Sequence, residues 1–450
     1  MSTFGARTFA HPIALLGAAL TTISAVLFVM SLLLEVVGFH TSPYLGIVTF
    51  IGLPALFLLG LALIPIGTWR QRRRVARGDA SPWPVLDLSL PPARRLVAIV
   101  GVLTIVNVAI VALAAAKGVE YVDSTGFCGT VCHTAMKPES IAHRGGPHAR
   151  VTCASCHVGP GPQGFVAAKM GGVRRLVAVV RGNYARPVAA PVHDLPSTQG
   201  TCENCHDPRA WLGDRLRKVS VFADDEANTD QTEVLTVRAG GGGWDRGGPQ
   251  GAHWHASPDH RVEYVATDAR RDTIAWVRVV DRDGKTRDFA AGGADPRKIP
   301  AGERRTMDCV DCHNRVGHPI AISTGRAVDE ALASGLLPSL PFVRREAVAA
   351  LDAAVKAPGD RSAGRRLESF YAKAYPALST GAGPGLRRAI AGVDAIQARH
   401  VFPAMRVAFA SYPDRISHTD DKGCFRCHDD EHKAVDGGAI PQDCERCHTP

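Results

Sequence analysis

The sequence has few charged residues in its first quarter and no regular repeat along its length. Of the 52 basic and 43 acidic residues, only 12 lie within residues 1–117. Because the sequence has no regular repeat, it is neither collagen-like nor a coiled coil. A hydrophobic fraction of 46% excludes low-complexity disorder. A length of 450 residues excludes a disulfide mini-protein and indicates two or three domains. The shortage of charge near the N-terminus indicates a membrane part.

Three long apolar runs follow one another in this part. They cover residues 12–39, with Glu35 as the one charge, 45–69 and 96–116, both without charge. A helix of 21 residues is about 31 Å long, which crosses a hydrocarbon core of about 30 Å. The length and the close succession of the runs favour membrane spans over buried core helices or a cleaved signal peptide. We therefore predict three transmembrane helices in a membrane anchor over residues 1–117.

Arginine sets the expected orientation of this anchor. The loop 70–95 carries seven arginines, whereas the loop between the first two runs carries none. The positive-inside rule places the arginine-rich loop and the N-terminus in the cytoplasm of a bacterial inner membrane, and residues after Lys117 in the periplasm. Most of the net charge of +9 belongs to the anchor. A charge with this origin argues against nucleic acid as a partner.

Two further features of the anchor concern its chemistry. His11 and His40 flank the first run at opposite ends, so they cannot ligate a b-type haem at one depth. Glu35 is an intramembrane carboxylate, and such a residue is by default a candidate for a functional role. The alternative is that its side chain only reaches the headgroup layer.

No cysteine lies outside one repeated motif. All 12 cysteines fall into six clusters that end in histidine. The clusters are Cys128-x3-Cys132-His133, Cys153-x2-Cys156-His157, Cys202-x2-Cys205-His206, Cys309-x2-Cys312-His313, Cys424-x2-Cys427-His428 and Cys444-x2-Cys447-His448. C-x-x-C-H is the attachment signature of c-type haem: two thiols add to the two vinyl groups of a porphyrin, and the histidine ligates the iron. We predict six covalently attached haems, the first through a variant with three intervening residues.

Zinc sites and thiol-redox sites are the rivals of a single such motif. A zinc-ribbon array would not require histidine after every second cysteine, and neither would six disulfides. Six copies that use every cysteine therefore favour haem.

The histidines outside the motifs are candidates for the second iron ligand. Electron-transfer haems usually have two strong ligands. His318 lies too close to His313 to serve the same haem, so we expect it to serve a neighbour. The other candidates are His148, His418, His432 and one of His253 and His255. His143, His193, His260 and His400 are interpreted as non-ligands.

The first haem would then lack a distal histidine. Met136 follows His133 by three residues, and methionine occurs only six times in the chain. We predict Met136 as the ligand of the first iron, with an apolar packing role as the alternative.

The outer part of the chain has three predicted regions. Residues 118–320 carry four motifs and a small β insertion at about 207–300, where alternating segments flank an Asp283-Gly284 turn. Residues 321–410 form a helical connector, broken at Pro358-Gly359 and at 381–385. Residues 411–450 carry the last two motifs. The predicted fold class is mainly α with little regular structure, wrapped around its cofactors.

Residues 164–182 form an amphipathic segment, with apolar side chains interspersed with Lys169, Arg174, Arg175 and Arg181. A helix of this kind typically lies in the headgroup layer of a membrane. The first motif begins 11 residues after Lys117, so we expect the first haem at the membrane surface beside this segment.

The motifs and their order resemble a known family. FCGTVCHTAMKP, PHARVTCASCHVGPGP followed by Lys169, CENCH and MDCVDCHNRVGHPI resemble the NapC/NirT family of membrane-anchored multihaem quinol dehydrogenases. The resemblance covers residues 118–320. The chain departs from the usual pattern of one membrane anchor and four or five haems, and looks most like the larger inner-membrane relatives in metal-respiring bacteria.

The resemblance implies roles for several residues. It implies that the first haem, with Met136, accepts electrons from membrane quinol, menaquinol or ubiquinol, and that Lys169 lies at the quinol site. It also implies distal roles for His148, His318, and His253 or His255. The acidic residue that the family has after this lysine is missing here. Glu35, Glu120 or a haem propionate could accept the proton instead.

The predicted function is quinol oxidation at the periplasmic face in anaerobic respiration. Electrons would leave through the last haem pair to a periplasmic c-type cytochrome or reductase. Residues 414–450 have nine acidic and five basic side chains, which suits a basic partner or is simply a solvated surface. The alternatives are a terminal reductase for nitrite, an S-oxide or a metal, and a haem-bearing anchor subunit for a partner cytochrome.

Overall fold

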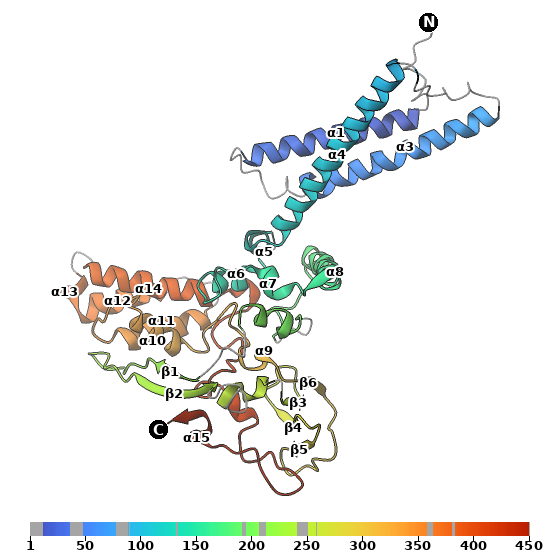
Figure 1. Ribbon diagram of the computed structural model, residues 1–450. Helices are drawn as coiled ribbons and strands as arrows, with labels where there is room; N and C mark the ends of the chain where they lie inside the picture. Colours follow the sequence, from blue (N-terminus) through green and yellow to red (C-terminus); the bar gives the residue numbers. More distant parts are fainter. Residues whose placement is uncertain are drawn as a thin grey trace. The chain divides into compact units, whose positions relative to one another are not determined.

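The computed structural model describes residues 12–36, 48–77, 89, 91–131, 134–190, 195–206, 213–240, 251–257, 259–357, 363–379 and 383–449. The chain forms two compact units, residues 1–124 and 125–450 (Figure 1).

The first unit consists of long apolar helices. Its elements are α1 (Pro12–Val36), the π-helical turn η1 (Val48–Gly52), α3 (Leu53–Ala76) and α4 (Pro91–Val122). Small residues allow α1 and α3 to pack closely. A Cβ atom on Gly17 would lie 2.7 Å from the carbonyl oxygen of Gly60, and one on Gly67 would lie 2.4 Å from the amide nitrogen of Ala14. Small residues at such interfaces are typical of helices that associate in membranes.

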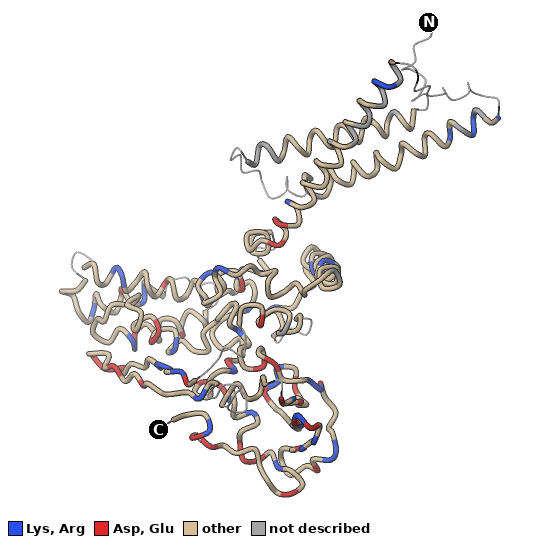
Figure 2. Tube along the Cα trace, viewed as in Figure 1, with Lys and Arg blue, Asp and Glu red and all other residues tan. Residues whose placement is uncertain are grey.

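Two of these helices are long and apolar enough to cross a membrane, over Pro12–Ser31 and Leu53–Gln71. Pro12–Ser31 lies within the first predicted run, and Leu53–Gln71 overlaps the second and ends two residues beyond it. α3 begins later than predicted, after η1, and its last turn contains Arg73 and Arg74. The basic cluster at the end of α3 (Figure 2) is therefore helical at its start, whereas the sequence predicted a loop. α4 contains the third predicted run, and its crossing of the membrane stays a prediction.

The second unit begins with short helices and contains all the motif cysteines. The helical elements up to the fourth motif are α5 (Thr125–Thr130), α6 (Lys137–Arg144), α7 (Cys153–His157), α8 (Gly161–Val180), η2 (Thr198–Gly200), η3 (Cys202–Asn204), η6 (Gly251–Ala256) and α9 (Cys309–Cys312). Those after it are α10 (Thr324–Ala333), α11 (Val343–Lys356), α12 (Ala363–Ala374), α13 (Pro376–Ser379), α14 (Pro384–His400), η7 (Pro403–Met405), η8 (Gly423–Arg426) and α15 (Cys444–Cys447).

A four-stranded antiparallel sheet lies in the predicted β insertion. Its order is β5 (Thr286–Ala290), β4 (Ile274–Val280), β3 (Arg261–Ala266) and β6 (Glu303–Thr306). Trp276, Tyr264 and Val265 are fully buried in it. The β4–β5 turn confirms the predicted hairpin, since Gly284 adopts φ +77° and the Asp281 amide donates to Lys285. β6 lies beyond the predicted end of the insertion.

A second, three-stranded sheet has the order β1 (Gly213–Val219), β2 (Glu233–Gly240) and β7 (His448–Thr449). The β1–β2 hairpin is mostly exposed. Its pairing with β7 places Val237 opposite His448 in the last motif. The sequence did not predict β7, because two residues carry no strand pattern.

Helices α10 to α14 form a bundle with its own apolar core (Figure 1). Val328, Leu351, Leu367 and Val393 are fully buried there, and burial of such a side chain stabilises a fold by about 1.5–3 kcal/mol. α11 ends at Lys356 and α14 begins at Pro384, which confirms the predicted breaks. The bundle therefore folds around an apolar core that contains none of the six motifs.

Candidate haem-binding sites

Five of the motifs share a local structure, a single helical turn around the two cysteines. In three of them the motif histidine donates its backbone N–H to the carbonyl of the first cysteine, at 2.8 Å for His206 and His313 and 3.0 Å for His428. Cysteines three apart on one turn lie on the same face. The turn therefore presents both thiols to one side.

Polar residues before the first cysteine begin three of these turns. Thr152 accepts a hydrogen bond from the Ser155 amide, Asp308 from Val310 and Asp443 from Glu445. These are helix N-caps, which satisfy amide groups that the short turn leaves open. In the first motif the structure describes Cys128, in α5, whereas Cys132 and His133 lie outside the described residues.

Five motif histidines each lie against a histidine from elsewhere in the chain. The centroid distances are 6.3 Å for His157–His318, 5.9 Å for His206–His148, 6.4 Å for His313–His253, 5.9 Å for His428–His255 and 6.1 Å for His448–His418. When two imidazoles ligate one metal, each metal–nitrogen bond is about 2 Å and each nitrogen lies about 1 Å from its ring centre. The two ring centres are then about 6 Å apart. The residues therefore fit an iron held between two imidazoles at five sites.

Hydrogen bonds orient several of these rings. Nδ1 of His148 lies 3.1 Å from the carbonyl of Val316, and Nδ1 of His255 lies 3.0 Å from that of Ala252. Nδ1 of His428 lies 3.0 Å from the carbonyl of Pro441. A carbonyl accepts only, so each Nδ1 carries the proton and Nε2 is left as the ligating atom.

Burial favours the neutral form, which binds metal, in four of the paired histidines. It lowers the pKa of His157, His253, His255 and His313 below the ordinary histidine value. A buried imidazolium would lose its hydration, so the uncharged ring is favoured near neutral pH.

The motif thiols show which sites are neighbours. A hydrogen bond with Cys128 lowers the pKa of Cys153 to about 7. Burial, and then the nearby Cys202, raises the pKa of Cys156. The first motif therefore lies beside the second, and the second beside the third.

The same pattern continues to the end of the chain. Burial and then Cys424 raise the pKa of Cys312 to about 12, and burial and then Cys447 raise that of Cys424. Cys309 lies near enough to Cys202 for that thiol to add to the effect of burial on its pKa. The six motifs thus follow one another in space in their sequence order.

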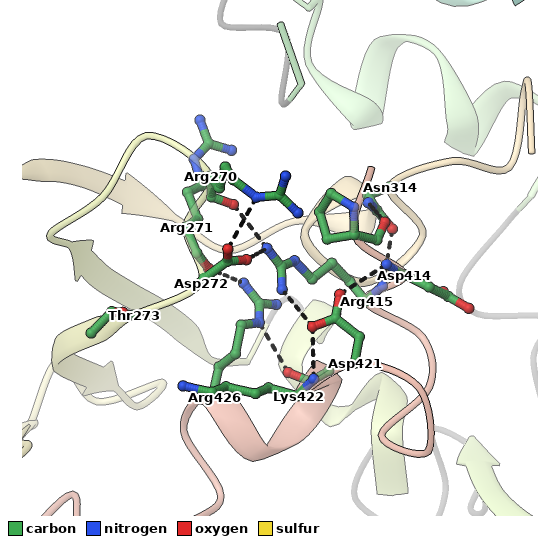
Figure 3. Close-up of polar contacts among 12 residues, drawn as sticks. Arg270, Arg271, Asp272, Thr273, Asn314, Asp414, Arg415, Asp421, Lys422 and Arg426 are labelled. Atoms are coloured by element: carbon green, nitrogen blue, oxygen red, sulfur yellow. Dashed lines mark hydrogen bonds and ion pairs between the residues drawn. The ribbon is translucent and has the colours of Figure 1, made fainter. Parts of the chain in front are cut away.

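A buried ionic cluster joins the segments around the fourth and fifth motifs (Figure 3). Arg415 is 3% exposed. Its guanidinium pairs with Asp272 and, at 3.4 Å, with Asp421. Its backbone N–H donates to the side-chain oxygen of Asn314 at 3.2 Å, and Asn314 directly follows His313. The C-terminal segment is thereby fixed to the fourth motif.

Arg426, inside the fifth motif, makes a more direct link. Its guanidinium donates to the carbonyls of Arg271 and Asp311, both at 3.0 Å. Asp311 lies inside the fourth motif, and its side chain accepts hydrogen bonds from Tyr264 at 2.6 Å and Arg305 at 2.9 Å. No feature of the sequence singled out these residues, because their partners are far apart along the chain.

The prediction for His432 is corrected by its contacts. His432 is 1% exposed. Its Nδ1 lies 2.9 Å from the Asp429 carboxylate, and its Nε2 lies 2.9 Å from the carbonyl of Ile274. Both ring nitrogens face protein oxygens, so the ring has no nitrogen to offer an iron. His432 instead fixes the C-terminal segment to β4.

The choice between His253 and His255 also changes. The sequence predicted one ligand from this pair, whereas η6 places both against different motif histidines. A 3₁₀ helix has three residues per turn, so residues two apart point in different directions. Of the histidines interpreted as non-ligands, His260 packs against Trp254 at a tilted angle, and His400 accepts a hydrogen bond from the Ala321 amide. His193 lies outside the described residues.

The predicted quinol-site residues are placed only in part. Lys169 lies on α8 with its ammonium 5.0 Å from the Phe165 ring centre. Glu120 pairs with Lys117 at 2.6 Å in the other unit, and nothing is described of the Glu35 side chain. Met136 precedes α6 and is half-buried, but its predicted partner His133 lies outside the described residues.

Comparison with known proteins places the chain in a family. No family model and no solved structure matches it. It is similar to the cytochrome c-type protein ImcH of Geobacter sulfurreducens, with 36% identity over 448 residues, covering 97% of this chain and 87% of the relative. The chain belongs to the ImcH family. This membership confirms a c-type cytochrome with covalently attached haem.

The two apolar helices agree with an ImcH-family protein of the membrane that takes part in electron transfer. The relative's name mentions neither NapC/NirT nor quinol. Quinol oxidation, the number of haems and the individual ligands therefore stay proposals.

Proposed function

We propose that this chain is a six-haem membrane quinol dehydrogenase that passes electrons to a periplasmic redox partner in anaerobic respiration. The observation that carries the proposal is the set of five histidine pairs, each with the spacing of two imidazoles on one iron. Two strong ligands suit electron transfer rather than substrate reduction at those five sites, because no position on the iron is left open.

The proposed ligands follow from the pairs. In sequence order, the second to sixth haems are held by His157 with His318, His206 with His148, His313 with His253, His428 with His255, and His448 with His418. We assign the first haem to Cys128, Cys132 and His133, with Met136 as the second ligand. Each bound haem supplies one-electron exchange between ferric and ferrous iron.

The chain's own residues set the order of the sites. Neighbouring thiols support a row from the first motif, nearest the membrane anchor in sequence, to the last. The Arg426–Asp311 contact and the Arg415 cluster hold the fourth and fifth sites together. A fixed separation between sites favours rapid transfer, because no search for a productive geometry is needed.

Quinol would enter at the membrane end of this row. α8 exposes apolar side chains, among them Val166, Met170 and Val180, and the same helix carries Lys169. Such a helix suits the headgroup layer, where lipid and quinol meet. We assign Lys169 to the quinol site, with Glu35, Glu120 or a haem propionate as the proton acceptor. The topology has three spans, with α4 as the third, a cytoplasmic N-terminus and a periplasmic haem domain.

Electrons would leave at the opposite end of the row. The acidic excess of residues 414–450 supports docking of a basic periplasmic cytochrome or reductase at the last two sites.

Replacing Lys169 tests the quinol assignment. In the membrane-bound protein, Lys169→Leu should slow haem reduction by menaquinol by about tenfold or more, because the site loses its cationic hydrogen-bond donor. Reduction by dithionite should be unchanged. Lys373→Leu, at an exposed position of α12, is the matched control and should keep the full rate. An unchanged menaquinol rate in Lys169→Leu would show that quinol binds elsewhere.

A further inference from the structure

One buried carboxylate contacts a proposed iron ligand directly. The carboxylate of Glu139, on α6, lies 2.7 Å from Nδ1 of His318. Arg315 donates to the same oxygen at 3.1 Å, and the Tyr412 hydroxyl donates to the other oxygen at 3.4 Å. The Glu139 side chain is 12% exposed. It therefore lies in a built site and not on an open surface.

Glu139 carries a negative charge in this site. Burial opposes ionisation, but the half-buried guanidinium of Arg315 lies 3.1 Å from one carboxylate oxygen and the Tyr412 hydroxyl donates to the other, so the anion is stabilised. The carboxylate can only accept hydrogen bonds in that form. The charge therefore lies beside the His318 ring, whose centre is 6.3 Å from that of His157 in the second site.

Other paired histidines have a different partner at Nδ1. His148 and His255 donate to backbone carbonyls, which are neutral. A carboxylate acceptor strengthens the electron donation of an imidazole more than a carbonyl does, and its charge favours ferric over ferrous iron. The second site thus differs from the third and fifth because a charged carboxylate, and not a neutral carbonyl, lies next to Nδ1 of its ligand.

We infer that Glu139 is a positioning residue that lowers the reduction potential of the haem held by His157 and His318. The inference rests on the ligand assignment in the proposed function, but it does not depend on quinol. α6 begins directly after Met136, the proposed ligand of the first iron. The same short helix thus links the first haem, where electrons would enter, to the second haem, whose reduction potential Glu139 would lower.

Spectroelectrochemical titration of the full-length protein tests the inference. Glu139→Gln keeps the size and shape of the side chain but removes its charge. One of the six haem components should move to higher potential, with about a tenfold change in its ferric-to-ferrous ratio at a fixed potential, which is about 59 mV for one electron. Haem content and the low-spin spectrum should stay as in the wild type.

Two further variants separate this role from a structural one. Arg315→Gln leaves the Glu139 charge without its cation, so the same component should move to lower potential. Asp329→Asn removes a buried carboxylate from its pair with Arg344 in the helical bundle, away from the paired histidines, and should shift no component. If Glu139→Gln does not yield a haem-loaded protein, the direction of the Arg315→Gln shift decides.

The inference is overturned if all six components keep their potentials in Glu139→Gln, or if Asp329→Asn produces the same shift. It is also overturned if Arg315→Gln moves the component upward. A protein that titrates as inferred but is not reduced by menaquinol would leave the inference intact and contradict the proposed quinol oxidation.

Discussion

Replacing His255 with alanine should convert one of the six haems to the high-spin form and leave the haem of its neighbour His253 unchanged. His255 lies 5.9 Å from His428, whereas His253 lies 6.4 Å from His313. Each variant should therefore open a different iron. Because the fifth site lies between the fourth and sixth, His255→Ala should also slow electron delivery to an external acceptor by about tenfold or more.

Optical spectra of the oxidised protein report the spin state, and a stopped-flow assay with a soluble acceptor reports the rate. His260→Gln is the control, because His260 packs on Trp254 close to the same helix. It should leave all haems low-spin. If His255→Ala retains six low-spin haems, the pairing with His428 does not represent iron ligation.

The second large effect is expected from Arg415. Arg415→Met should lower the free energy of unfolding by about 2–3 kcal/mol, since it removes a buried guanidinium from Asp421 and from Asp272, which then keeps Arg270 as its cation. The value lies below that of a fully buried pair because Asp272 is 38% exposed. The C-terminal haem segment should also become sensitive to protease, as the Arg415 side chain ties it to Asp272 and to the carbonyl of Arg270.

Urea unfolding and limited proteolysis measure these effects. Arg282→Met is the matched control, since Arg282 is 82% exposed in its pair with Asp259, and it should cost less than about 0.5 kcal/mol. Equal stability of the two variants would show that the cluster does not anchor the segment.

The sequence predicted the attachment chemistry well because that chemistry is local. Two thiols and a histidine within five residues define the motif. The same holds for the β4–β5 hairpin, where Gly284 provides the positive φ of the turn, and for the helices of the connector. These predictions needed no knowledge of distant contacts.

The second iron ligand was harder to predict because it depends on contacts between distant segments. His432 resembled a ligand from its place after the fifth motif, but it bonds the carbonyl of Ile274, 158 residues away. His253 and His255 seemed to be alternatives, because nothing in the sequence shows that one short helix faces two sites. Glu139 carried no signal at all, since its partners His318 and Arg315 lie far along the chain.

The angles between paired rings allow the most direct test of the account. The rings are near-parallel in the second and fourth sites, at 19° and 27°, and steeply inclined in the third, fifth and sixth, at 73°, 80° and 76°. In low-spin ferric haem, near-parallel imidazoles give rhombic electron paramagnetic resonance signals, whereas near-perpendicular imidazoles give strongly anisotropic ones.

The central claim is that this chain carries six haems, five of them between two histidines. The measurement is the electron paramagnetic resonance spectrum of the oxidised full-length protein, together with its haem content. The account predicts six haems per chain, with two rhombic and three strongly anisotropic low-spin signals from the histidine pairs. Fewer than five bis-histidine signals, or a high-spin signal from any site after the first, would contradict it.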